Sequence, residues 1–280
     1  MPTTAPIARS AASLARELHG TDLDWEAVAS TASTNADLVA RARVQAPPRP
    51  IVLAADEQTA GRGRFGRTWH ATPGGALLFS VAVPWKRAPA DSAAVALACG
   101  VAVAQCLEEA GVRAALKWPN DVLLDGRKLA GILTELTEDR SGAHALVIGL
   151  GLNLFVDPAQ RRAIEQPVAE LAEALGREPV VHGRERWLAR LALALIGAAA
   201  RFEVHGFGSV CADFNRYCAF LGQTVTLHAG GQQVHRGIVL GVDEQGRLLL
   251  KCGERVLTMI SGEMSLRAQL PDRIHLGEPP

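Results

Sequence analysis

Short apolar stretches of strand length, separated by glycine-containing turns and set among long helical segments, constrain the fold of this chain most strongly. Residues 50–58 (PIVLAADEQ) and 74–84 (GGALLFSVAVP) have the length and composition of buried strands. Residues 112–118, 121–136 and 144–154 form three more β-rich stretches, with turns such as DGRK inside them. Strands that cluster around long helices predict an α+β domain in which the helices pack on a central sheet.

Four segments have the spacing of helices. Ser10–His19 carries leucines and alanines at helical spacing and is followed by Gly20, while Ser33–Val44 begins with a capping serine or threonine. Asp91–Ala110 is the third, and its apolar run is too short for a membrane span, so we expect a buried helix. Arg184–Val204 has the apolar stripe of an amphipathic helix.

The residue pattern of the sequence changes near Leu221. From there the chain consists of short strands separated by the turns AGG, DEQG and GE, which predicts a small β-barrel-like domain. We therefore divide the chain into a larger domain over residues 1–220 and a second domain over residues 221–270.

Composition excludes several classes of protein. Lysine plus arginine equal aspartate plus glutamate at 29 each, so the average surface is not that of a polyanion-binding protein. Five cysteines without a C-x-x-C pair argue for a reducing compartment and against structural zinc. The first twenty residues lack the apolar region of a secretory signal, which predicts a cytoplasmic protein without membrane segments.

Positive charge is concentrated in residues 61–70, GRGRFGRTWH, between the first two strand-like stretches. The glycines allow the backbone to approach a ligand closely, and the guanidinium groups of Arg62, Arg64 and Arg67 suit phosphate or carboxylate oxygens. An RG-rich segment that grips nucleic-acid phosphates is the weaker alternative in a chain of zero net charge. The Walker A pattern is absent, and Trp69 could either pack in the core or stack on a base.

Two further stretches carry polar groups among packed residues. KWPNDVLLDGRKLAGIL, residues 117–133, is expected to place Lys117, Asn120, Asp121 and Lys128 on two strands joined by a turn, so that their polar groups converge. A solvated hairpin would carry the same charges. In GLGLNL, residues 149–154, the glycines leave positions of a strand without side chains, so that a flat ligand could lie against it. Close strand packing explains these glycines equally well.

Taken together and in this order, DEQTAGRGRFGRTW, KWPND, GRKLAGILTE and GLGLN resemble the biotin protein ligases. The resemblance covers roughly Ser33 to Arg267, because GIVLGVDEQGRLLL and SGEMSLR are similar to that family's SH3-like C-terminal domain. It implies a class II synthetase-like catalytic domain with a central mixed β-sheet. It also implies an enzyme that uses ATP and Mg²⁺ to convert biotin into biotinyl-5′-AMP, and then modifies one lysine of a biotin carboxyl carrier domain.

The resemblance also assigns roles to residues. It implies that biotin contacts Ser33, Thr34, Asn35, Gln58, Gly61, Arg62, Gly63, Arg64, Lys128, Gly131 and Leu133. It places Arg64, Arg67, Trp69, Asn120, Lys128 and Asn153 on the nucleotide, and Asp121 on the metal. The residues expected to be catalytic are Arg64, Lys128 and Asp121.

The chemistry can be stated from charge alone. A carboxylate with a reference pKa of about 4 is already ionised at neutral pH, so activation needs charge neutralisation, which Arg64, Lys128 and Mg²⁺ would supply. The acceptor lysine, with a reference pKa of about 10.4, must instead lose a proton, and Asp121 is a hypothetical acceptor for it. Because water would hydrolyse the mixed anhydride, we expect the loop at 61–67 to be mobile without ligand and to order over the adenylate.

Two features depart from the family's pattern. About thirty residues precede Ser33, too few for the DNA-binding domain of many relatives, so we expect a ligase that does not bind DNA. The nearest match to the family's second nucleotide-covering loop is VAEL, residues 168–171. Lipoate or octanoate ligases, and a ligand sensor built on a disabled ligase fold, remain alternatives, and a two-fold homodimer is the expected oligomer.

Overall fold

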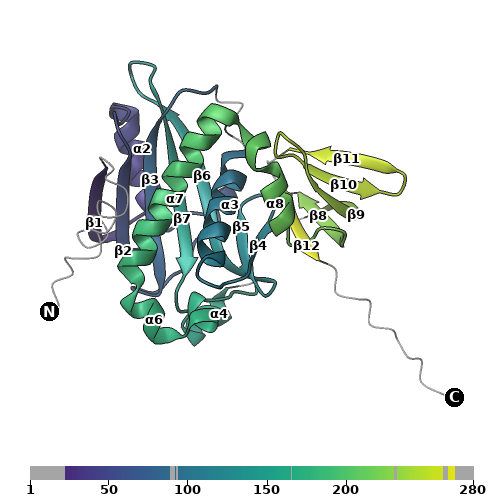
Figure 1. Ribbon diagram of the computed structural model, residues 1–280. Coiled ribbons are helices and arrows are strands. Elements are labelled where there is room, and N and C mark those ends of the chain that lie inside the picture. The colour runs from purple at the N-terminus through teal and green to yellow at the C-terminus, as the bar shows by residue number, and fades with distance from the viewer. Residues whose placement is uncertain are drawn as a thin grey trace.

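A mixed seven-stranded sheet forms the centre of the molecule (Figure 1). The structure, a computed structural model, describes residues 23–88, 92, 94–164, 166–229, 232–260 and 264–268. The strand order is β1-β2-β3-β7-β6-β5-β4, and only β1 and β2 run parallel. The expected α+β domain with a central mixed sheet is thus confirmed. The strands are β1 (Asp24–Thr31), β2 (Ile51–Gln58), β3 (Ala76–Trp85), β4 (Ala114–Lys117), β5 (Asp121–Leu124), β6 (Arg127–Glu138) and β7 (His144–Asn153).

Two long helices cover one face of the sheet. α3 (Val95–Glu108) packs on β4, β5 and β6, and α7 (Arg184–His205) lies beside it and packs on β3. α3 is apolar around most of its circumference because the sheet and α7 both contact it. α7 is amphipathic and turns Leu191 and Leu195 inward. These contacts make the α3 side the main hydrophobic core (Figure 1).

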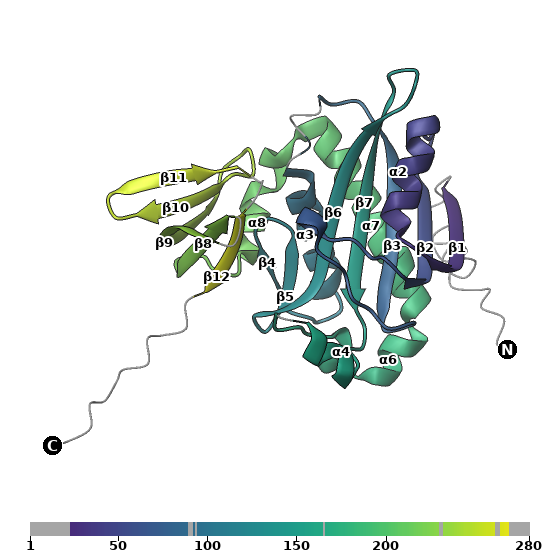
Figure 2. The same ribbon diagram turned by 180° about the vertical axis from the view of Figure 1, so that it is seen from behind.

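The opposite face is only partly covered. α2 (Thr34–Val44) packs on β2, β3 and β7 through a small cluster that contains Leu38 and Val39. Beside α2, the loop that joins β2 to β3 crosses over β7 and β6 (Figure 2). This loop includes the short helix η1 (Arg64–Gly66). A space between the loop and the sheet is therefore open to a ligand.

A second, antiparallel sheet follows at the C-terminal end, beside α8 (Cys211–Tyr217) and β4 (Figure 1). Its strand order is β11-β10-β9-β8-β12. The small C-terminal β domain is confirmed. Its strands are β8 (Thr224–Ala229), β9 (Gln232–Val242), β10 (Leu248–Cys252), β11 (Arg255–Met259) and β12 (Met264–Ala268).

Several elements differ from the sequence-based expectation. β1 was not predicted, because an edge strand with largely accessible side chains has no continuous apolar run. The other elements without a strong sequence signal are short: α4 (Pro158–Ala163), α5 (Leu171–Leu175), α6 (Arg177–His182), η3 (Phe207–Val210) and α8. The helix expected at Ser10–His19 and the cap expected at residue 91 lie outside the described residues. None of the described helices is long and apolar enough to cross a membrane.

Candidate active site

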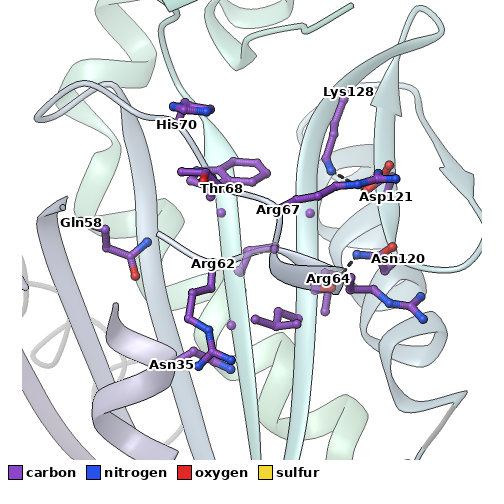
Figure 3. A pocket seen from close by; sticks show the side chains of 18 of the residues that line it. Asn35, Gln58, Arg62, Arg64, Arg67, Thr68, His70, Asn120, Asp121 and Lys128 are labelled. Carbon is purple, nitrogen blue, oxygen red and sulfur yellow. Dashed lines mark hydrogen bonds and ion pairs between the residues drawn. The ribbon is translucent and has the colours of Figure 1, made fainter. Parts of the chain in front are cut away.

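The space between the loop and the sheet is a cavity of about 150 Å³. Side chains from α2, β2, the crossing loop, the β4–β5 turn, β6 and β7 line it (Figure 3). Of the sixteen residues that the sequence assigned to the site, all but Gly61 line this cavity: Ser33, Thr34, Asn35, Gln58, Arg62, Gly63, Arg64, Arg67, Trp69, Asn120, Asp121, Lys128, Gly131, Leu133 and Asn153.

One end of the cavity is polar because the first turn of α2 lies there. Ser33 is the N-cap residue, and its hydroxyl accepts a hydrogen bond from the Ala36 amide at 3.4 Å. Gln58 Oε1 accepts from both the amide and the hydroxyl of Thr34, at 2.8 and 3.2 Å. Since that hydroxyl donates to Gln58, the Ser80 hydroxyl is the donor in its 2.7 Å contact with Thr34. This chain of bonds fixes the polar groups that a ligand would meet.

Asn35 is 3% exposed and uses only half of its amide. Its Nδ2 donates to Glu135 on β6, and its Oδ1 accepts from no described residue. The other oxygen of Glu135 lies 3.3 Å from the Arg62 guanidinium, which points toward Asn35 in Figure 3. A buried oxygen without a donor costs free energy unless a ligand or water supplies one.

Backbone hydrogen bonds give the arginine loop a defined shape. The Trp69 amide donates to the Gly61 carbonyl at 2.9 Å, and the Gly63 amide donates to the Arg67 carbonyl at 2.7 Å. Gly61 closes the base of the loop: a Cβ atom there would lie 2.7 Å from the Trp69 carbonyl oxygen. Gly61 thus shapes the loop without lining the cavity. At the tip, Phe65 adopts a positive φ of 58° and is 55% exposed.

The indole of Trp69 lies flat on two glycines of the sheet. A Cβ atom at Gly151 would come within 2.5 Å of the ring, and one at Gly131 within 3.1 Å. The ring centroid is 5.5 Å from the Lys128 ammonium. Gly151 of GLGLN is therefore explained by close packing against the protein's own tryptophan, whereas Gly149 of the same motif packs against Asn35.

Charged groups converge at the other end of the cavity. The Lys128 Nζ lies 2.7 Å from one oxygen of Asp121, and the Lys117 Nζ lies 3.9 Å from the other. The three side chains come from β4, β5 and β6, which corrects the expected arrangement on two strands. Asn120 sits in the turn after the cis Trp118–Pro119 bond, and its amide donates to the Ile132 carbonyl at 2.9 Å. Two cations thus face one carboxylate.

Arg64 adds a third cation to this region. Burial lowers the pKa of its guanidinium from the ordinary value, Asp121 opposes that shift, and Arg67 adds to it. An arginine pKa lies so far above 7 that the group stays charged at neutral pH. This end of the cavity therefore carries an excess of positive charge and is suited to carboxylate or phosphate oxygens.

The side-chain amide of Asn153, at the end of β7, donates hydrogen bonds to the backbone. Its Nδ2 donates to the carbonyls of Lys128 and Ala169, at 3.3 and 3.0 Å. The Ala169 amide in turn donates to the Lys128 carbonyl, so the segment containing Val168 runs alongside the start of β6. Val168 of the VAEL segment thus lines the cavity.

Sequence motifs did not single out several residues of the site. Ser80 lies in an apolar strand, and Glu135 ends the motif GRKLAGILTE without having been assigned a role. Both reach the site through strand register: Ser80 pairs with Gly149, and Glu135 pairs with Val147. The other lining residues include Phe65, Thr68, His70, Phe79, Trp118, Pro119, Ile132, Leu150, Ile164 and Gln166.

The described residues contain no group of three or more His, Cys, Asp or Glu side chains that could enclose a metal ion. Asp121 is a single carboxylate that two lysines already face. Mg²⁺ is commonly held by one or two carboxylates together with the phosphates of a nucleotide. The site fits such a shared ion and does not fit an ion held by the protein alone.

Comparison with known proteins agrees with this geometry. Residues 27–153 match the Biotin/lipoate A/B protein ligase family, and residues 220–267 match the Biotin protein ligase C terminal domain. The chain is 34% identical over 260 residues to the biotin–[acetyl-CoA-carboxylase] ligase of Mycobacterium tuberculosis, an alignment that covers 90% of this chain and 93% of that enzyme. It is also 34% identical over 215 residues to the bifunctional ligase/repressor BirA of Escherichia coli, covering 76% of this chain and 65% of that protein.

Solved structures give the same result. The biotin protein ligase from Aquifex aeolicus in complex with biotin and ATP superimposes with a TM-score of 0.71 at 27% identity, over 89% of this chain and 100% of that one.

Proposed function

The chain belongs to the biotin protein ligase family, and from this we propose how its own residues carry out the two half-reactions of biotin attachment. In the first, the biotin carboxylate attacks the α-phosphate of ATP, forming biotinyl-5′-AMP and releasing pyrophosphate. In the second, a lysine amine of a biotin carboxyl carrier domain attacks the acyl carbon, an amide bond forms, and AMP leaves. The observation that carries the proposal is the single cavity that joins the buried polar pocket at α2 to the cations around Asp121.

Biotin's polar ureido end is proposed to lie at the first turn of α2. Thr34, Gln58 and Asn35 already form an ordered set of donors and acceptors there. The aliphatic chain would then run over Gly131 and Leu133 toward the cations. This orientation brings the carboxylate to Lys128 and Arg64 without moving any strand.

Activation of the carboxylate is a problem of charge. Carboxylate and phosphate repel each other, and charge accumulates as the transfer proceeds, so fixed cations lower the barrier. Lys128 is held by Asp121 at 2.7 Å, which orients its ammonium before the substrate arrives. Arg64 and Lys128 are the proposed catalytic cations, and Lys117 is a third cation that the sequence named only as part of its motif.

The nucleotide is proposed to lie under the arginine loop. Arg67 and Trp69 belong to that loop, while Asn153 lies beside the start of β6 and Asn120 lies beside Ile132 farther along that strand. Because both hydrogen-bond contacts of Asn153 Nδ2 are to backbone carbonyls, only its oxygen would be free for adenine; its main effect would be to hold Val168 against the site. Mg²⁺ would arrive with the phosphates and be contacted by Asp121, where it neutralises phosphate charge.

Asp121 is also the proposed proton acceptor for the carrier lysine. Two ammonium groups already face its carboxylate, so this part of the proposal requires a separate test. Transfer from preformed biotinyl-5′-AMP should slow in Asp121→Asn. An unchanged transfer rate would exclude this role and leave Asp121 as an orienting group for Lys128.

Two further proposals concern the domains and the oligomeric state. We divide the chain into a catalytic domain over residues 1–220 and an SH3-like domain over 221–270, supported by the separate sheet that begins at Thr224. A homodimer is proposed because β1 is an edge strand of the central sheet. Light scattering of the purified protein tests the dimer directly.

ATP/pyrophosphate exchange tests the proposed function. The purified protein is assayed with Mg²⁺ and with biotin, lipoate or octanoate, beside Lys128→Ala and, as a matched control, Lys86→Ala, whose lysine does not line the cavity. We expect exchange with biotin alone, lost in Lys128→Ala and kept in Lys86→Ala. Exchange with lipoate or octanoate instead would assign the chain to the sister ligases, and none with any acid would favour a ligand sensor.

A further inference from the structure

We propose that Glu135 is a positioning residue that sets the polarity of the ligand pocket, so that the pocket selects an acid whose polar head offers an N–H donor. The inference rests on the proposed function, because it concerns the end of the cavity where biotin's head would lie. Glu135 does not line the cavity, and no role was assigned to it from the sequence, although it is the last residue of GRKLAGILTE. It acts through Asn35, which does line the cavity.

The chemistry of the two groups fixes the direction of the Asn35 amide. An ionised carboxylate only accepts hydrogen bonds, whereas an amide has one donor end and one acceptor end. Glu135 Oε2 therefore accepts a hydrogen bond from Asn35 Nδ2, and Asn35 Oδ1 must face away from the carboxylate. Without Glu135, the amide could turn over and present its N–H groups instead.

The acceptor end of the Asn35 amide is buried, and it lies between two residues that line the cavity, Asn35 itself and Gly149. Asn35 Oδ1 accepts no hydrogen bond from a described residue, although the side chain is 3% exposed. It lies against Gly149 of β7, where a Cβ atom would come within 2.7 Å of it. The neighbouring Thr34 and Ser80 hydroxyls donate elsewhere, to Gln58 and to Thr34. A ligand N–H placed here would satisfy an oxygen that the protein leaves without a donor.

The second oxygen of Glu135 connects the same carboxylate to the arginine loop. Its Oε1 lies 3.3 Å from the Arg62 Nη2, with the carboxylate side chain 26% exposed. One carboxylate thus holds an amide on α2 and a guanidinium on the loop between β2 and β3. The ion pair fixes the position of the Glu135 carboxylate, which is what the orientation of Asn35 requires.

A cyclic urea matches this pocket, whereas a dithiolane or an alkyl chain does not. The urea of biotin offers two N–H donors, while lipoate and octanoate offer none at that end. Leaving a buried acceptor unpaired is costly, so sites built for a hydrogen-bonding group discriminate strongly against analogues that lack it. The Glu135–Asn35 pair would therefore contribute to the choice of biotin over the acids of the sister ligases.

The test exchanges the two groups. We compare wild type, Asn35→Asp, Glu135→Gln and the double variant, with Glu138→Gln as a control at an exposed position of the same strand. The readouts are biotin binding by calorimetry and KM against kcat in pyrophosphate exchange. Asn35→Asp places two carboxylates against each other. Glu135→Gln replaces the carboxylate with an amide that can itself donate, so the Asn35 amide is no longer forced to point its N–H group at residue 135. Each substitution should therefore weaken biotin binding about tenfold or more.

The double variant distinguishes positioning from general damage. When both substitutions are present, the new glutamine amide on β6 donates to the new aspartate on α2. The second oxygen of that aspartate again faces the ligand as an acceptor, while the glutamine oxygen remains for Arg62. We expect biotin binding to recover to within about threefold of wild type, with kcat changed little throughout, because the reacting carboxylate lies at the other end of the cavity.

A second readout uses biotin methylated on each ureido nitrogen in turn. Wild type should reject at least one methylated form, and Glu135→Gln should discriminate less. Normal biotin binding in Glu135→Gln, or a double variant as weak as the singles, would overturn the inference. If wild type itself binds no biotin, the proposed function fails instead, and the two failures are therefore distinguishable. Thermal unfolding of each variant identifies any loss caused by misfolding.

Discussion

The indole Nε1 of Trp118 donates a hydrogen bond to the carbonyl oxygen of Gly246, 3.1 Å away. Trp118 is 1% exposed and belongs to the KWPND turn between β4 and β5, whereas Gly246 lies in the turn between β9 and β10. The turn of the small C-terminal sheet thus reaches the turn that carries Asn120 and Asp121. Through this contact the second sheet packs against the turn that carries the charged end of the site.

Gly246 has little room for a side chain. Its φ is +76°, and a Cβ atom there would lie 2.6 Å from the Ala94 Cβ and 2.9 Å from a Leu97 methyl group. Gly246→Ala should therefore lower the free energy of unfolding by about 2–4 kcal/mol, the sum of backbone strain and overpacking. Urea denaturation measures the loss.

Gly253 provides a matched control for that substitution. Its φ of +61° imposes the same kind of backbone strain, but nothing lies within 4 Å of its Cβ position. Gly253→Ala should cost only about 1–2 kcal/mol. Equal losses at the two glycines would mean that the contact with Ala94 and Leu97 contributes nothing.

Gly151→Ala should impair activation of biotin while leaving the fold intact. The new methyl group would meet the Trp69 ring at 2.5 Å, and Gly151 is paired on both sides in the sheet, so the ring is the group that must move. Moving Trp69 also moves the loop that carries Arg64, and a displacement near 1 Å can cost about 100-fold in rate. Pyrophosphate exchange at saturating biotin measures the effect.

The control for this variant is Gly197→Ala in α7. The Cβ position at Gly197 is open, and alanine is the better helix former, so stability should rise by about 0.5–1 kcal/mol with unchanged exchange activity. Full activity in Gly151→Ala would mean that the position of Trp69 is unimportant for the reaction.

The sequence predicted the central sheet and most of the site because those features are local. Apolar runs marked β2, β3 and β7, and the motifs carried Lys128, Asp121 and Arg64. Ser80 and Glu135 were missed because their roles arise from partners 46 and 100 residues away along the chain, which only the strand register brings together. β1 was missed for a related reason, since an edge strand is specified by its neighbour more than by its own pattern.

Asp139 should make stability depend on acid pH. Its carboxylate accepts hydrogen bonds from the Ala46 amide at 2.8 Å and from the Ser141 and Ala143 amides at 2.7 and 3.1 Å. These hydrogen bonds hold the pKa of Asp139 well below its ordinary value of 3.8, and the bond from the Ala46 amide has the largest effect. The folded state therefore favours the ionised form, so the stabilisation is complete above the unfolded pKa and is lost as the pH falls below it.

Asp139→Asn removes this stabilisation at every pH. We expect the difference in Tm between wild type and variant to be constant from pH 5 to 8 and to shrink below about pH 4, where protonation begins to remove the same contribution from wild type. Glu254→Gln, in the exposed turn between β10 and β11, is the control. A difference that stays constant down to pH 2 would contradict the proposed linkage.

The arginine loop should become resistant to trypsin when biotinyl-5′-AMP forms. Arg62 has a side chain that is 50% exposed despite its ion pair with Glu135, and Phe65 at the loop tip is 55% exposed, so we expect trypsin to reach residues 62–67 in the ligand-free protein. An adenylate beneath the loop would bind Arg64 and Arg67 through its phosphate and oppose the local opening that a protease requires. Cleavage after Arg62 and Arg64, followed by mass spectrometry, should therefore slow by about tenfold or more at saturating biotin and ATP.

Two internal controls test whether the protection is specific to the adenylate. Cleavage after Arg255, exposed in the hairpin of β10 and β11, should keep its rate, because that hairpin does not line the cavity. Lys128→Ala should show little protection with the same ligands, since it lacks the cation proposed to drive adenylate formation. If biotin alone protects the wild-type loop as well as biotin with ATP does, the loop responds to the acid and not to the reactive intermediate, and its proposed task of shielding the anhydride from water is wrong.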